Sequence, residues 1–182
     1  LTIDQDLGGT IPLEIIINFQ DKSSKDSSLS DFENEFEEEF NVLEQQDSYW
    51  FDSQKLRIAE KIHTYLANKE YIGSILSLHS LSMLVASLGL GTDDFTIAFL
   101  YKNSPQNLKN QLFTPYANIA KNQMRFVFRT FDSNPNLKRN LFIHEIQNDL
   151  TTLLQNESVT FKINGMMVLY NNLLQSLIAS QV

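Results

Sequence analysis

Three segments of the chain alternate apolar and polar residues in the way that half-buried β-strands do, and a fourth is a short apolar run. In the first segment every second residue from Leu13 to Phe19 is apolar, so one face of the strand is strongly hydrophobic. The pattern predicts a sheet with one buried face. The predicted strands are residues 12–19, 71–77, 123–131 and 158–164.

Two longer segments repeat apolar residues at the spacing of an amphipathic α-helix. The first is preceded by Asp52 or Ser53 as an N-cap, and we expect a helix over residues 53–68. The second follows a turn that places Pro135 in its first turn, and we expect it over residues 137–154. Its expected apolar face consists of Leu137, Leu141, Ile146, Leu150, Leu153 and Leu154.

Residues 78–117 predict a block of short helices. Gly89 is expected to end one helix as its C′ residue, and Thr92 with the two aspartates after it to begin the next. Ser104 is expected to cap a third helix that has Pro105 in its first turn. After Gly165 an amphipathic helix is expected to continue to the end of the chain.

The strands and long helices form two strand–helix–strand units in tandem. This order predicts an α+β fold of the ferredoxin-like, split βαβ plan, with an antiparallel sheet and helices on one of its faces. We expect a single domain over residues 1–182. Its parts are a first unit at 12–77 with an acidic insertion at 20–48, a helical insertion at 78–117, a second unit at 118–164 and a C-terminal amphipathic helix at 165–182.

Composition and charge narrow the class of function. The chain has 182 residues, 42% of them hydrophobic, and no cysteine, which excludes disulfides, thiolate nucleophiles and cysteine-based metal sites. Its formal net charge is −8, but eight carboxylates lie between Asp31 and Asp47 without a single Lys or Arg. The remainder has 14 acidic and 14 basic residues and no basic stripe, so we expect no nucleic-acid partner.

An ordered set of segments resembles the first extracytoplasmic loop of RND-superfamily exporters, closest to the MMPL-type group that includes hopanoid-lipid transporters. The set covers almost the whole chain except the insertion at 20–48. The segments are IDQDLGGTIPLEIIINF, WFDSQKLRIAEKIHTYL, YIGSILSLHSLSMLV, VFRTFDSNPN and MMVLYNNLLQSLIASQ.

This resemblance implies a soluble periplasmic, porter-type domain between transmembrane helices one and two of a proton-driven exporter in the bacterial inner membrane. The implied partners are those helices, a second related loop and a lipid or other hydrophobic substrate; a homo-oligomer is also open. We expect no cofactor. The implied membrane-proximal residues are Gly8, Gly9, Thr10, Leu169, Tyr170, Leu173 and Leu174.

Candidate catalytic chemistry is sparse, and we expect no enzyme. The three histidines, His63, His79 and His144, have no metal-ligand spacing. GLGTDD at 89–94 follows a helix and lacks the lysine of a phosphate-binding loop. The acidic run lacks the glycine and the alternating ligands of a calcium loop, which favours a solvated segment.

Three features leave alternatives open. Arg125 and Arg129 share one strand face, where they form either an outer face paired with carboxylates or an anion site. The Met166–Met167 pair either contacts lipid or packs on the sheet. Phe95 and Phe99 are our candidates for ligand contact. The alternatives to substrate handling are an interaction module that assembles a membrane complex and a hydrolase on the same scaffold.

Overall fold

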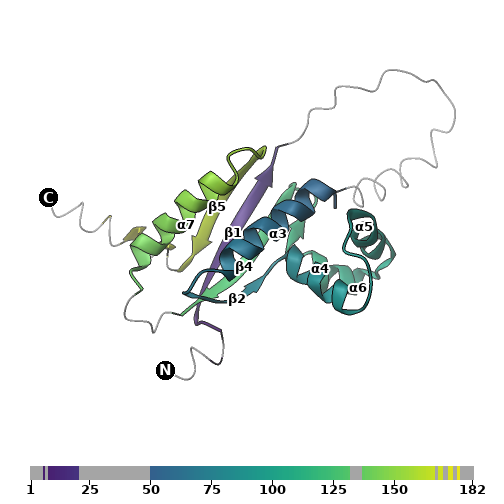
Figure 1. The fold of residues 1–182 in the computed structure, drawn as a ribbon, viewed down its shortest axis with the longest axis horizontal. Coiled ribbons are helices and arrows are strands. Elements are labelled where there is room, and N and C mark those ends of the chain that lie inside the picture. The colour runs from purple at the N-terminus through teal and green to yellow at the C-terminus, as the bar shows by residue number, and fades with distance from the viewer. Residues whose placement is uncertain are drawn as a thin grey trace, which may run out of the picture.

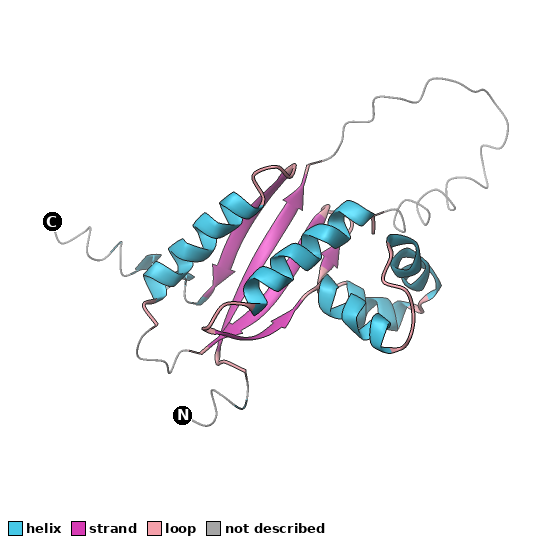
Figure 2. Ribbon diagram, in the orientation of Figure 1, coloured by secondary structure: helices cyan, strands magenta, loops and turns pink. Residues whose placement is uncertain are grey.

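The computed structural model has an α+β architecture in which helices pack on a five-stranded antiparallel sheet (Figures 1 and 2). The α+β class and the antiparallel sheet expected from the sequence are confirmed. The structure describes residues 6, 8–20, 50–131, 137–166, 168, 169, 172, 173 and 176.

The sheet interleaves the two strand–helix–strand units. Its order is β2-β4-β1-β5, with the two-residue β3 paired to β4, so each unit has its two strands separated by one strand of the other unit. All pairs are antiparallel. The strands are β1 (Ile11–Phe19), β2 (Ile72–Leu76), β3 (Ala117–Asn118), β4 (Gln123–Thr130) and β5 (Val159–Gly165).

Two long helices, α3 and α7, lie side by side over one face of the sheet, and the short helices gather beside α3 (Figure 1). α3 begins behind Asp52, whose carboxylate accepts a hydrogen bond from the Lys55 backbone N–H at 2.8 Å. The helices are α3 (Ser53–Ala67), α4 (Leu78–Ser87), α5 (Asp94–Asn103), α6 (Gln106–Leu108), the π-helix η1 (Lys109–Phe113) and α7 (Arg139–Leu153).

The core lies between the helices and one face of the sheet, which we call the inner face. Alternate residues of β1 and β4 are fully buried there, and their neighbours point to the opposite, outer face. Apolar residues of α3 and α7 cover this inner face. The inner-face residues of the two central strands are Leu13, Ile15, Ile17, Met124, Phe126 and Phe128.

A cluster of polar side chains joins α3 to α7. Asp149 of α7 accepts hydrogen bonds from the Tyr65 hydroxyl and from the Lys69 ammonium, both at 2.8 Å. Lys69 also bonds to Glu145. Burial and the hydrogen bond to Asp149 raise the pKa of Tyr65, while the Lys69 bond lowers the pKa of Asp149. These hydrogen bonds link α3 and the residues just after it to α7, and they fix the spacing of the two helices.

The predicted helix over 137–154 is confirmed as α7, but it begins at Arg139 and its buried face differs from the expectation. Leu141 is 61% exposed, whereas Phe142 and Ile143 are buried with Ile146 and Leu150. Because residues 141–143 are all apolar, several different faces of this helix could be the buried one. The position of the sheet selects the face with Phe142 and Ile143.

The helical block at 78–117 is confirmed, with two corrections of detail. Gly89 has the positive φ of 78° expected after α4, and Asp93 is the N-cap of α5. Ser104, however, ends α5: its hydroxyl donates to the Leu100 carbonyl oxygen at 2.6 Å, and Pro105 precedes α6 without a side-chain cap. β3 and the π-helical turn η1 were not anticipated.

Some sequence-based expectations fall outside the described residues. They are the acidic insertion from residue 21 to 48, the turn at 132–136, and the side chains of Met167, Tyr170 and Leu174.

A glycine turn packs tightly against the sheet where β1 begins. Gly8 and Gly9 both have positive φ, 64° and 102°. A Cβ on Gly9 would lie 2.8 Å from the Thr130 carbonyl oxygen, and one on Gly73 would lie 2.4 Å from the Gly8 carbonyl oxygen. This turn therefore requires that residue 73 of β2 has no side chain, which only glycine provides.

We expect Gly73→Ala to lower the free energy of unfolding by about 1–3 kcal/mol, because its methyl group would overlap backbone atoms of Gly8 and the ring of Phe131. Urea denaturation measures the effect. Ser74→Ala, which adds no atoms at the next position, should change stability by less than about 0.5 kcal/mol. Equal midpoints for the two variants would contradict the close packing of this turn.

Candidate functional site

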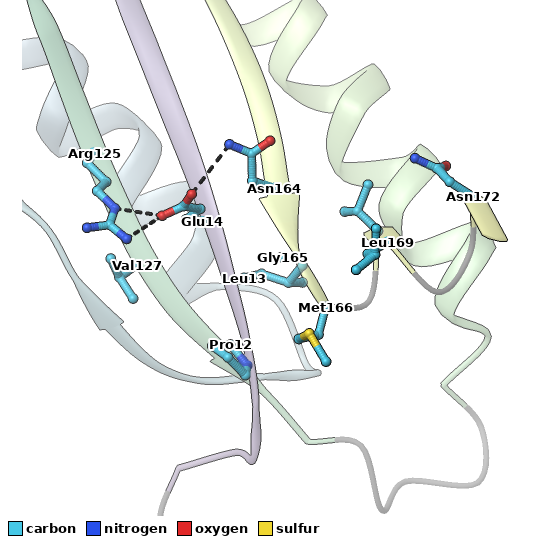
Figure 3. A pocket seen from close by; sticks show the side chains of 11 residues that line it. Pro12, Leu13, Glu14, Arg125, Val127, Asn164, Gly165, Met166, Leu169 and Asn172 are labelled. Carbon is cyan, nitrogen blue, oxygen red and sulfur yellow. Dashed lines mark hydrogen bonds and ion pairs between the residues drawn. The ribbon is translucent and has the colours of Figure 1, made fainter.

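A large cavity opens on the outer face of the sheet, and we call it the sheet-face cavity (Figure 3). It has a volume of about 620 Å³, within the range of roughly 300–1,000 Å³ that is common for small-molecule sites. Its walls are β1, β4, the end of β5 and the helical residues that follow β5. Its apolar lining consists of Pro12, Leu13, Val127, Met166, Val168 and Leu169.

One ion pair supplies the charge inside the cavity. Arg125 of β4 donates from Nε to Oε2 of Glu14 at 2.6 Å and also from Nη2 to the same oxygen. Asn164 of β5 donates to Oε1 of Glu14 at 3.4 Å (Figure 3). The strand register places these three side chains on the outer face, because Glu14 stands opposite both Val127 and Asn164.

Gly165 allows the chain to leave β5 and line the cavity. It is the last residue of β5, has a φ of 141° and pairs with Leu13. A Cβ at this position would lie 2.8 Å from the Pro12 carbonyl oxygen and 2.9 Å from Cδ2 of Leu13. Only glycine permits this close approach to β1, after which Met166 and Leu169 lie across the cavity from the ion pair (Figure 3).

The outer face is positively charged, although the chain as a whole is acidic. Its described ionisable side chains are Glu14, Arg125, Arg129 and Lys162, which gives one negative and three positive charges. Of the two alternatives for the arginines, pairing with a carboxylate holds for Arg125. Arg129 is exposed, and none of the described residues forms an ion pair with it.

A second hollow, of about 450 Å³, lies between α3, α4 and the start of α5. His79 and Glu60 line it, together with Met83 and the first residues of α5. Beneath it the rings of His63 and His79 lie 5.0 Å apart between centroids. No sequence pattern predicted this pair, because the two residues are on different helices that are brought together by the short β2 strand.

The histidine pair is held in its neutral form by its surroundings. Nδ1 of His63 lies 2.9 Å from the hydroxyl of Ser77, the fully buried N-cap of α4. Burial lowers the pKa of both histidines; His79 further lowers that of His63, and Glu60 partly opposes the shift at His79. Because Ser77 accepts from the Ser80 backbone N–H, its own proton is available for a neutral His63.

The residues singled out from the sequence occupy three different places. Phe95 and Phe99 stack on the outside of α5 with centroids 6.3 Å apart, are 74% and 56% exposed, and line neither hollow. Leu169 lines the sheet-face cavity, while Leu173 is exposed beyond it. The polar and apolar residues that form the cavity come from three separate segments of the chain, so no single sequence motif predicted it.

Across the described positions, no three metal-binding side chains converge on one point. None of the helices described is both long and apolar enough to span a bilayer. No protein-family model, curated protein or solved structure matches the chain.

We expect the free energy of unfolding to fall as the pH is lowered through the ordinary histidine pKa of 6.5 toward the lower pKa values of the folded protein. In this range the unfolded chain binds more protons than the folded one, so stability is complete above the range and lost within it. Urea denaturation at pH 7.5 and 5.5 measures the change.

His79→Gln should reduce this loss, because it removes one titrating group and its repulsion of His63. His144→Gln is the matched control, since His144 is exposed on α7, away from the pair. A pH dependence that is the same in His79→Gln as in the unmodified protein would contradict the assignment to the histidine pair.

Proposed function

We propose that this chain is a substrate-handling domain on the extracytoplasmic, periplasmic side of the membrane, belonging to a proton-driven RND-type exporter of the MMPL group. Its substrate is a lipid or another hydrophobic compound. Protons move through membrane helices outside this chain, and the domain itself performs no chemistry. It acts by moving relative to a second, related loop, which opens and closes an apolar passage.

The observation that carries this proposal is the sheet-face cavity. Apolar side chains line it on opposite sides, from Val127 on β4 to Leu169 after β5, and its carboxylate is already paired with Arg125. Such a lining favours an apolar ligand body and offers few groups for catalysis, because no unpaired nucleophile or base is among the lining residues described.

The topology of the sheet is a second support. The interleaved order β2-β4-β1-β5 favours the ferredoxin-like, split βαβ plan expected of a porter-type domain. Leu13 near the start of β1 pairs with Gly165 at the end of β5, so the chain enters and leaves the sheet at the same end. This geometry suits a domain carried between two neighbouring membrane helices.

A second candidate function is an assembly module without a ligand of its own. The observation that favours it is the apolar surface of the short helices, where Leu84 and Leu88 of α4 and Phe95 and Phe99 of α5 are each at least half exposed. Exposed apolar residues at i and i+4 spacing present a helix face suited to a protein partner. A homo-oligomer or another part of the transporter would supply that partner.

Matched substitutions at two leucines distinguish the two candidate functions. We expect Leu169→Gln to weaken the binding of a hydrophobic fluorescent probe, 1-N-phenylnaphthylamine, by about fivefold to tenfold, because an apolar contact with the bound probe is replaced by an amide. Leu88→Gln, at a leucine that is 70% exposed on α4, should leave probe binding unchanged. Fluorescence titration of the purified domain measures both.

Both leucines are more than half exposed, so neither change should unfold the protein, and thermal unfolding verifies this. Sedimentation analysis measures self-association, which tests the assembly-module function. If Leu88→Gln abolishes self-association while Leu169→Gln leaves probe binding intact, the assembly module replaces substrate handling as the function of this domain.

A further inference from the structure

We propose that the ligand of the sheet-face cavity is an anionic amphiphile, with its apolar chain inside the cavity and its negatively charged head at the rim, in the positive field of Arg129 and Lys162 on the outer face of the sheet. This inference rests on the proposed substrate-handling function and adds the charge of the substrate to it. It also selects the anion-site alternative for Arg129.

The first step is the location of positive charge in an acidic protein. The chain has a net charge of −8, yet the described outer face has three cationic side chains and one carboxylate. Cationic side chains on an acidic protein are commonly neutralised by neighbouring carboxylates. Arg129 and Lys162 are exposed and form no ion pair with any described residue, so their charge faces solvent.

The second step is that the carboxylate in the cavity does not repel an anion effectively. Oε2 of Glu14 accepts two hydrogen bonds from Arg125, and Oε1 faces the Asn164 amide. Its negative charge is compensated within the pair, and Glu14 is the more enclosed partner, with 24% of its side chain exposed against 50% for Arg125. Among the described residues of the outer face, the net charge beside the cavity therefore comes from Arg129 and Lys162.

The third step is the position of these cations at the margins of the cavity. Arg129 stands directly opposite Pro12, a lining residue, and two residues after Val127 on the same strand face. Lys162 lines a smaller hollow of about 360 Å³ that shares Asn164, Val168 and Asn172 with the sheet-face cavity. Each cation is thus next to the apolar lining without being part of it.

The cavity thus has an apolar lining and positive charges at its margin. This arrangement fits an amphiphile, which has an apolar chain and a separate charged head. A long lysine or arginine side chain reaches a phosphate or carboxylate head at the rim, while the apolar walls cover the chain. A free anion would gain only exposed, screened contacts. A neutral lipid would leave the cations unused.

The test compares four probes by isothermal titration calorimetry with the purified domain, each below its micelle concentration. Dodecyl phosphate is the anionic amphiphile, dodecyl maltoside the neutral one and dodecyltrimethylammonium the cationic one, while inorganic phosphate represents the head alone. We expect dodecyl phosphate to bind at least about tenfold more tightly than the maltoside and inorganic phosphate to show no measurable binding. Added salt should reduce the difference.

Single charge removals locate the head. Arg129→Gln and Lys162→Gln should each weaken dodecyl phosphate binding by about threefold and together by about tenfold, as expected for exposed charge pairs. Arg129→Lys should retain binding. Lys102→Gln, which removes a positive charge from α5 in the helical block, is the matched control and should have no effect.

The outcomes separate this inference from the function on which it rests. Equal affinity for dodecyl phosphate and dodecyl maltoside, or an unchanged affinity in the double variant, overturns the anionic assignment and leaves substrate handling in place. Binding of inorganic phosphate as tight as that of dodecyl phosphate shows a free-anion site and also overturns it. If none of the three amphiphiles binds, the substrate-handling function itself is wrong.

Discussion

Burial of one face of the β1–β4 strand pair is the constraint on which the other features of this structure depend. Six fully buried side chains on these two central strands pack under α3 and α7, and burying each such side chain contributes about 1.5–3 kcal/mol. A shift of either strand's register by one residue would turn its three core side chains toward solvent. The pairing of β1 with β4 and β5 is fixed by this burial, and every position on the outer face is fixed with it.

The outer face is therefore a product of core packing. Glu14 lies between the buried Leu13 and Ile15, and Arg125 lies between the buried Met124 and Phe126. Their side chains meet because the register that buries their neighbours places them on the same face of adjacent strands. The ion pair adds little energy at such exposure, but it is positioned as firmly as the core itself. The packing of the core therefore also holds the residues of this binding surface in place.

Much of this arrangement could be predicted from the sequence, because the alternation of apolar and polar residues in strands and the spacing of apolar residues in helices follow directly from which side chains are buried. The strands near 12–19 and 123–131 and the helix over 53–68 are found close to their expected limits. The predicted buried face of α7 was wrong at Leu141, because consecutive apolar residues are compatible with more than one buried helix face.

Features made by contacts between distant segments left no local pattern. His63 and His79 meet only after β2 has folded back beside α3, and the two residues of β3 are too few to show alternation. The sheet-face cavity depends on the same kind of long-range contact. Its floor was implied by the polar positions of β1 and β4, but its far wall depends on the close approach of Gly165 to β1, where a side chain would not fit.

The two apolar regions of the surface are separate, which bears on how one small domain would serve an exporter. The sheet-face cavity lies beside the end of β5, whereas Phe95 and Phe99 lie on α5 in the helical block, at the opposite end of the view from α7 (Figure 1). The chain enters the block through Ser77, which follows β2 and caps α4, and it returns to the sheet at β3, which pairs with β4. A contact made by the block would reach the cavity through β2 and its partner β4, the strand that carries Arg125, Val127 and Arg129. A partner bound to the helices and a ligand bound to the sheet would thus act on the same strand from its two sides.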